Sequence, residues 1–172
     1  MFDKEFRFTG KHANYVTKLS SKFGDTTAKI FDSNVNVYVQ APIVGFLFQK
    51  KSPIDNSSED TAHILRDQIL GYKQDLEFNM QLILLLDKEY EPDETKRVDK
   101  AFRNFGKDEN DIELFSSYVR GGIEILYEKL IENASTSDDY IQNLCDFTNQ
   151  INELYNSKVN ITELQNLLAK RL

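Results

Sequence analysis

Few side chains in this sequence have the types and the spacing that catalysis or metal binding requires. The two histidines, His12 and His63, stand alone, and neither has a cysteine, an aspartate or a second histidine at the spacing of metal ligands. We therefore interpret both as surface residues. The sequence has no phosphate-binding glycine loop, no zinc-protease helix and no nucleophile elbow. It thus predicts a protein that is not an enzyme and that holds no metal or other cofactor.

Two acidic segments have the carboxylates of a hard-cation site but not its order. They are "LDKEYEPDE" (86–94) and "FGKDENDIE" (105–113). Both lack the alternating ligands and central glycine of a calcium loop, and Pro92 interrupts the first. We interpret the first as a solvated corner between two helices. A hydrolase with carboxylates drawn from different helices stays a third alternative, which a buried cluster of Asp and Glu would favour.

The net charge of -7 is unevenly distributed. Residues 1–52 contain eight Lys and Arg against four Asp and Glu, whereas the remainder contains thirteen against twenty-four. If any part of the chain binds phosphate, it is therefore the first part. The candidate nucleic-acid-binding residues are Lys4, Arg7, Lys11, Lys18 and Lys22. The alternative is an ordinary solvated surface on which these charges have no partner.

The composition fits one folded unit with appendages. The chain has 172 residues, of which 40% are hydrophobic and 28% charged, as in globular proteins. Its one cysteine, Cys145, excludes an intrachain disulfide framework and favours a reducing cytosol. The N-terminus lacks a signal peptide, and the longest apolar runs are far shorter than the ~20 residues of a membrane span. We expect a cytoplasmic protein without membrane contact.

The predicted elements are mainly helices. Phe6 and Phe8 alternate around Arg7, which predicts a strand or extended arm, and a helix follows over 11–23. Residues 26–48 fit either a helix or a strand; we favour the helix, which Pro42 is expected to kink or end. Further helices are expected at about 58–70, 73–90, 94–105, 113–132, 139–155 and 161–172. The expected fold is a helical bundle (1–132) with a C-terminal helical arm or hairpin (133–172).

The run "SYVRGGIEILYE" places two glycines inside the most strongly amphipathic of these helices. Read as a loop, Arg120, Gly121 and Gly122 would form a backbone nest for an anion. Helical spacing runs unbroken through the segment, so we favour a helix. Its apolar face carries the helix-packing residues Phe115, Val119, Gly122 and Leu126. We expect Gly122 to admit the close approach of another backbone, and Gly121, on the polar side, to tolerate alanine.

Three stretches carry a resemblance to a known family. They are "FRFTGKHANYVTKLSSKFG" (6–24), "MQLILLL" (80–86) and "FSSYVRGGIEILYEKL" (115–130). The first has the strand-then-helix order of a ribbon-helix-helix unit, in which N-terminal strands of two chains pair. Together they resemble the DndE family of bacterial DNA phosphorothioation systems, which are linked to phage defence. The resemblance implies a compact, non-catalytic helical oligomer that binds duplex DNA through a basic face.

Two functional hypotheses follow. The first is a non-enzymatic, homo-oligomeric accessory protein of a bacterial DNA-modification or phage-defence system, whose basic N-terminal unit binds duplex DNA. The alternative is a protein-interaction subunit that docks on a larger enzyme through residues 134–172 and does not contact nucleic acid. The chain departs from the resembled family in its greater length, its arm after Asn133 and its acidic balance.

Overall fold

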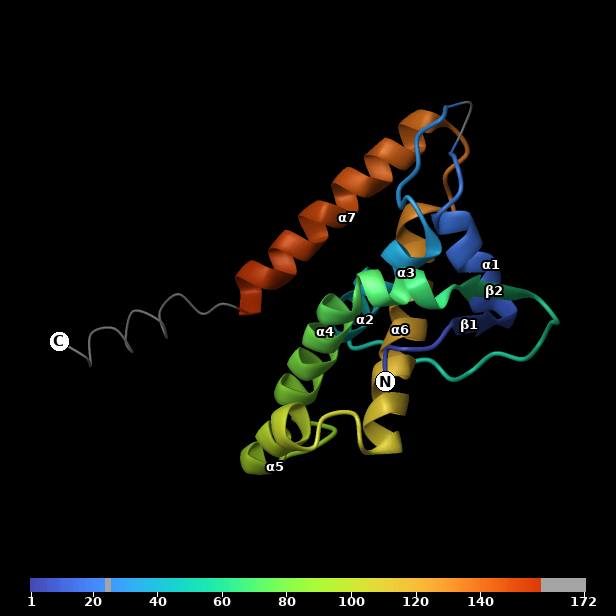
Figure 1. The fold of residues 1–172 in the computed structure, drawn as a ribbon. Coiled ribbons are helices and arrows are strands. Elements are labelled where there is room, and N and C mark those ends of the chain that lie inside the picture. The colour runs from blue at the N-terminus through green and yellow to red at the C-terminus, as the bar shows by residue number, and fades with distance from the viewer. Residues whose placement is uncertain (24–25, 159–172) are drawn as a thin grey trace.

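The computed structural model describes residues 1–23 and 26–158 and confirms a mainly helical fold with a short N-terminal strand (Figure 1). The elements in chain order are β1 (Phe6–Thr9), α1 (Gly10–Leu19), α2 (Asn34–Leu47), β2 (Thr61–Ile64), α3 (Arg66–Gly71), α4 (Lys73–Leu86), α5 (Glu94–Val98), the π-helix η1 (Asp99–Arg103), α6 (Glu109–Leu130) and α7 (Ser137–Lys158). No helix among the described residues is long and apolar enough to cross a membrane.

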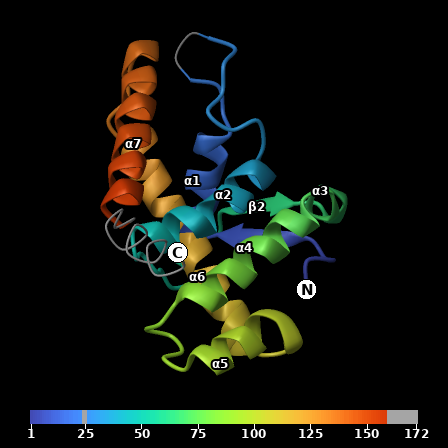
Figure 2. The same cartoon turned by 90° about the vertical axis from the view of Figure 1, so that its left-hand side faces the viewer.

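Helix α6 is the central element, and it contacts α1, α2, α4 and α7 (Figures 1 and 2). It begins after Asp108, whose side chain accepts a hydrogen bond from the amide of Asn110. Such a cap satisfies one of the free N–H groups at a helix start. Its apolar residues from Leu114 to Leu130 are buried, except the partly buried Ile125 and Tyr127, so the amphipathic pattern correctly located the helix that organises the core.

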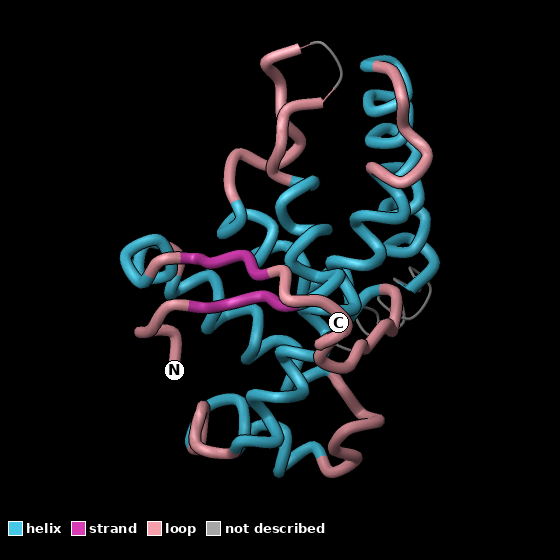
Figure 3. Tube along the Cα trace, turned by 90° about the vertical axis from the view of Figure 1, so that its right-hand side faces the viewer, coloured by secondary structure: helices cyan, strands magenta, loops and turns pink. Residues whose placement is uncertain are grey.

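Strands β1 and β2 form an antiparallel ribbon (Figure 3). Phe8 lies opposite Ala62, and both are buried, whereas Arg7 and its partner His63 are exposed. The helix predicted over 58–70 is therefore wrong for its first half, and α3 occupies only the second. Strand β1 thus pairs with a strand of its own chain, and the pairing of N-terminal strands between two chains, as in a ribbon-helix-helix unit, stays a prediction.

Residues 34–47 form a helix, which resolves the ambiguity of this segment. Helix α2 is covered on most sides, and eight of its fourteen residues are buried. An element covered on all sides shows no single apolar stripe, which is why its periodicity also fitted a strand. Pro42 does not end the helix, which continues to Leu47.

The glycines of α6 lie where two backbones approach closely. A Cβ added at Gly122 would overlap the carbonyl of Ala41 on α2, and one added at Gly45 of α2 would overlap the carbonyl of Tyr118 on α6. We call these four residues the α2–α6 seam. At each glycine the lost helix propensity is offset by packing that no larger residue permits.

Gly121 also has a packing role, so the expectation that it tolerates alanine is wrong. It is buried, and an added Cβ would overlap the carbonyl oxygen of Lys50. Its neighbour Arg120 is buried as well and donates from Nε to the carbonyl of Ser52 at 2.7 Å. The amide of Ser52 in turn donates to the carbonyl of Ser117 at 3.0 Å. The supposedly polar side of α6 is thus covered by residues 50–52.

The middle of the chain has the predicted order of helices, although the first of them is shorter than the predicted 73–90. Helix α4 ends at Leu86, and α5 starts after Asp93, whose side chain accepts from the amide of Lys96. The π-helix η1 continues α5, and Gly106 then turns the chain with φ of 72°. A positive φ suits glycine because it has no Cβ.

Helix α7 leaves the bundle at an angle (Figure 1). Phe147 anchors it: the side chain is buried, and its ring stacks on that of Phe48 with centroids 5.9 Å apart. Ile141 and Leu144 are exposed at 56% and 44%. The second helix expected in the arm, over 161–172, lies outside the described residues.

Candidate nucleic-acid interface

The five predicted basic residues fall into two groups. Lys4 precedes β1, and Arg7 lies on the exposed face of that strand. Lys11 and Lys18 lie on α1 and Lys22 just after it, all three exposed. Lys18 and Tyr15 both contact Tyr127 of α6, so the α1 group follows the border between α1 and α6.

Lys11 differs from the others because its charge is already compensated. Its Nζ lies 3.0 Å from Oε1 of Glu124, which also contacts Nε2 of His12 at 3.0 Å, while Lys50 lies 3.5 Å from Oε2. Burial alone would raise the pKa of Glu124, but the hydrogen bonds from Lys11, Ser52 and His12 outweigh it and lower that pKa. Hydrogen bonding to Glu124 raises the pKa of Lys11. Glu124 thus acts as a local counter-charge, not as a free acid.

His12 is not the surface residue that its isolation in sequence predicted. Its exposure is 1%, and it lies between α1 and α6. Burial lowers its pKa, and the hydrogen bond to Glu124 opposes this only in part. A neutral imidazole that donates from Nε2 fits this position. His63, by contrast, is exposed as expected.

Lys18 and Lys22 line a pocket that we call the α1–α6–α7 pocket. Its volume is about 360 Å³. The lining residues are Lys18, Ser21, Lys22, Phe23, Ile30, Tyr127, Ile131, Glu132, Ala134 and Tyr140. Among the residues that the structure describes, neither lysine forms an ion pair. The pocket therefore combines two lysines and one glutamate, Glu132, with three aromatic rings.

The aromatic rings of this pocket come from three parts of the chain. Phe23, after α1, meets Tyr140 of α7 with ring centroids 5.0 Å apart and a tilt of 32°. Tyr127 of α6 stacks on Tyr15 of α1 at 3.9 Å and 4°. Lys18 Nζ lies 3.3 Å from the hydroxyl of Tyr127 and 5.4 Å from its ring centroid. The run "YVTKLSSKF" shows lysines beside aromatic residues in the sequence, but Tyr127 of α6 and Tyr140 of α7 lie next to them only in the folded chain.

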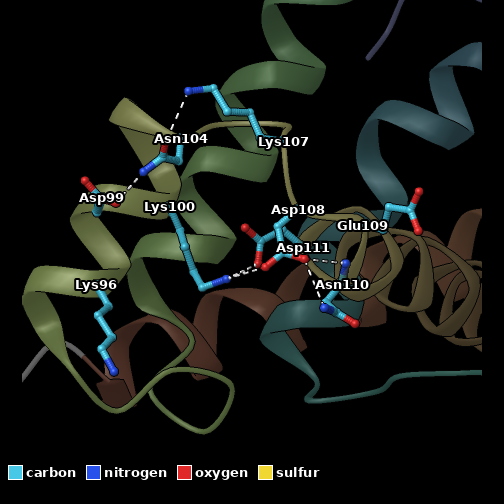
Figure 4. A pocket seen from close by; sticks show the side chains of 9 residues that line it. All are labelled: Lys96, Asp99, Lys100, Asn104, Lys107, Asp108, Glu109, Asn110 and Asp111. Atoms are coloured by element: carbon cyan, nitrogen blue, oxygen red, sulfur yellow. Dashed lines mark hydrogen bonds and ion pairs between the residues drawn. The ribbon is translucent and has the colours of Figure 1, made fainter.

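A second, larger pocket of about 680 Å³ lies between η1 and the start of α6 (Figure 4). Lys100 bridges Asp108 at 3.0 Å and Asp111 at 2.7 Å, and the hydroxyl of Tyr90 donates to Asp111 at 2.6 Å. Burial and the bond to Asp111 raise the pKa of Tyr90 to about 12. Oδ2 of Asp111 has no hydrogen-bond partner. Lys100 and Tyr90 both contact the other oxygen, Oδ1, so the cluster joins η1 to the start of α6.

The acidic corner at 86–94 is solvated only in part. Asp87 is buried, and its Oδ1 accepts from the amides of Glu89 and Tyr90. Its Oδ2 accepts from the hydroxyl of Tyr118 at 2.8 Å and lies 3.2 Å from Nζ of Lys51. Asp87 therefore joins the end of α4 to α6. Within 1–23 and 26–158, no three His, Cys, Asp or Glu residues are arranged to hold a metal ion.

Comparison with known proteins gives one match. The family model described as "DNA sulphur modification system-associated protein 4" matches residues 5–163, which include the helical core and all of α7. The match is to this family and not to DndE specifically, so the resemblance holds at the level of DNA sulphur modification systems. No curated protein and no solved structure matches the chain.

Proposed function

The chain belongs to the DNA sulphur modification system-associated protein 4 family, and from this premise we propose that it is a non-enzymatic accessory protein that binds DNA. The family places it among proteins associated with DNA sulphur modification systems. The observation that supports the DNA-binding part is the pair of exposed lysines Lys18 and Lys22, neither of which forms an ion pair with a described residue. Uncompensated lysines attract phosphate, and the attraction is independent of sequence.

The five proposed phosphate contacts differ in whether their charge is already paired within the protein. Lys4, Arg7, Lys18 and Lys22 are exposed and make no ion pair with described residues. Lys11 is bound to Glu124, so its contribution to phosphate binding is the smallest of the five. Exposed lysines on a single surface are common in proteins, so the interface is identified by a binding measurement.

A titration of the purified protein with duplex DNA across a salt series tests this function. The affinity should fall steeply as salt rises, because each phosphate contact releases counterions. The double substitution Lys18→Gln and Lys22→Gln should reduce the salt slope by about 2, roughly 1 for each lysine. Lys88→Gln, at an exposed lysine beyond α4, is the matched control and should leave the slope unchanged. Salt-insensitive or absent binding contradicts the proposal.

A protein-interaction subunit is the second candidate, and the exposed apolar residues of α7 favour it. Ile141 and Leu144 are three positions apart on one face and are both exposed. A double substitution to serine should weaken binding to a purified enzyme of the same sulphur modification system without unfolding the core. Removal of residues 134–172 should abolish that binding. Unchanged binding in both variants rejects this function.

The homo-oligomer implied by the resemblance is also a proposal. Light scattering of the full chain measures its mass directly. A mass that stays at the 20.0 kDa of one chain over the whole concentration range contradicts it.

A further inference from the structure

The α1–α6–α7 pocket contains aromatic rings, which phosphate binding does not require, since a positive surface alone attracts a duplex backbone. We propose that the pocket holds one unpaired nucleotide of the bound DNA, with its base against Phe23 and Tyr140 and its phosphates beside Lys18 and Lys22. This inference rests on the proposed function, because it assumes that the protein binds DNA.

The shape of the pocket favours a single base over a duplex. A volume of about 360 Å³ lies in the range of small-molecule sites. A paired base inside a duplex cannot enter such a cavity, whereas an unpaired base can leave the stack. Extrusion costs least for a base that is already unpaired, so the pocket selects for that state.

The lining chemistry matches both halves of a nucleotide. Proteins that bind unpaired DNA combine basic side chains along the backbone with aromatic rings on which the bases stack. Here Phe23 and Tyr140 approach each other from the loop after α1 and the first turn of α7. Lys18 is held beside Tyr127, yet it makes no ion pair with described residues and keeps its charge available.

Tyr127 contributes one wall of the pocket. Its ring is covered on one side by Tyr15, with centroids 3.9 Å apart, so it cannot rotate freely. Tyr140 belongs instead to the start of α7, the helix that leaves the bundle. The pocket therefore has a rigid wall on α6 and a second wall on a separate element. Stacking on Tyr140 would link DNA binding to the placement of α7.

Three DNA probes of one sequence test the inference with the full chain. The first is a fully paired duplex, the second carries one extra unpaired 2-aminopurine nucleotide, and the third carries an abasic residue at that position. The unpaired base should increase affinity about tenfold over both other probes, in line with base–aromatic stacking. The fluorescence of 2-aminopurine should fall on binding, because stacking quenches it.

Matched variants separate stacking from charge. Tyr140→Leu keeps an apolar side chain in the pocket and should abolish both the preference for the unpaired base and the quenching. Phe102→Leu removes an exposed aromatic ring of η1, far from the pocket in sequence, and should change neither. Lys22→Gln should weaken binding to all three probes. Thermal melting checks that each variant folds, and Phe23→Leu replaces Tyr140→Leu if the latter does not.

The outcomes distinguish this inference from the function on which it rests. Equal affinity for the unpaired base and the abasic residue overturns the nucleotide pocket, as does a preference that survives both Tyr140→Leu and Phe23→Leu. In either case lysine-dependent binding of the paired duplex leaves DNA binding intact. No binding of any probe overturns both.

Discussion

At the scale of single residues, three cationic or basic side chains share the carboxylate of Glu124. Lys11, His12 and Lys50 all reach it, and the imidazole is the most deeply buried of the three. Nearby Arg120 also opposes a positive charge on His12. The buried site between α1 and α6 therefore accommodates one neutral imidazole and one ionised carboxylate.

This arrangement predicts loss of stability in mild acid. The pKa of His12 is lowered below its ordinary 6.5, mainly by burial, so the unfolded chain takes up a proton before the folded chain does. The contribution of His12 is thus complete above pH 6.5 and falls as the pH drops below it. Glu124 and Asp87, whose pKa values are lowered from 4.5 and 3.8, add a second loss at lower pH.

The measurement is the free energy of unfolding by urea from about pH 8 to 5. His12→Gln keeps an N–H donor for Glu124 and removes the titration, so its curve should be flatter below pH 6.5. His63→Gln, on the exposed side of β2, is the control and should follow the parent chain. Identical slopes in all three proteins would show that His12 does not set the acid response.

The burial of individual polar side chains was the feature least predictable from the sequence. His12 was wrongly interpreted as a surface residue, because its isolation in the sequence does not reveal that α1 packs against α6 there. The segment that covers the polar side of α6, residues 50–52, carries two lysines and a serine and gives no sign of burial. By contrast, the excess of basic residues after Phe8 was evident from the sequence alone.

At the scale of elements, the α2–α6 seam decides how closely the two central helices pack. Gly122 was identifiable from sequence, because it interrupts a regular apolar stripe with a residue that lacks a Cβ. Its partners Ala41 and Gly45 were not, since no pattern in α2 distinguishes the side that faces α6 from the others. Gly121 required knowledge of Lys50, which is distant in sequence and contacts it only through a backbone carbonyl.

Alanine substitutions at the two glycines of the α2–α6 seam, and at Gly121 beside it, should destabilise the fold. Gly45→Ala, Gly121→Ala and Gly122→Ala each place a methyl group against backbone atoms, so each should lower the free energy of unfolding by about 1–3 kcal/mol or more. Gly71→Ala is the control: an added Cβ meets nothing within 4 Å there, and the change should be neutral or mildly stabilising. Equal effects at all four positions would contradict close packing at the seam.

The strand ribbon shows why local pattern alone misassigned one element. "TAHILRDQIL" contains apolar residues at helical spacing, yet its first half pairs with β1. The alternation of buried Ala62 and Ile64 with exposed Thr61 and His63 has the period of a strand. Because β1 is far away in sequence, the pairing partner that selects the strand was invisible.

At the scale of the whole molecule, α7 depends on a small contact. Phe147 is its one buried apolar residue in the described part, and it stacks on Phe48, while Tyr140 contacts Phe23 and the partly buried Ile151 packs against the core. Phe147→Ala should therefore release α7 from the bundle while the core remains folded. Limited proteolysis measures this, with faster cleavage within about 131–136 expected. Thr148→Ala, at the next and exposed position, is the control. Unchanged cleavage would mean that other contacts hold α7.

The order in which the chain is synthesised gives the seam a further consequence. Helix α2 emerges from the ribosome long before α6, yet Ala41 and Gly45 fit only against a helix that is made much later. Domains fold as units once their sequence is available. The N-terminal half, with its apolar α2, therefore lacks its native packing partner until α6 has left the exit tunnel. A nascent chain halted before that point should still bind chaperones.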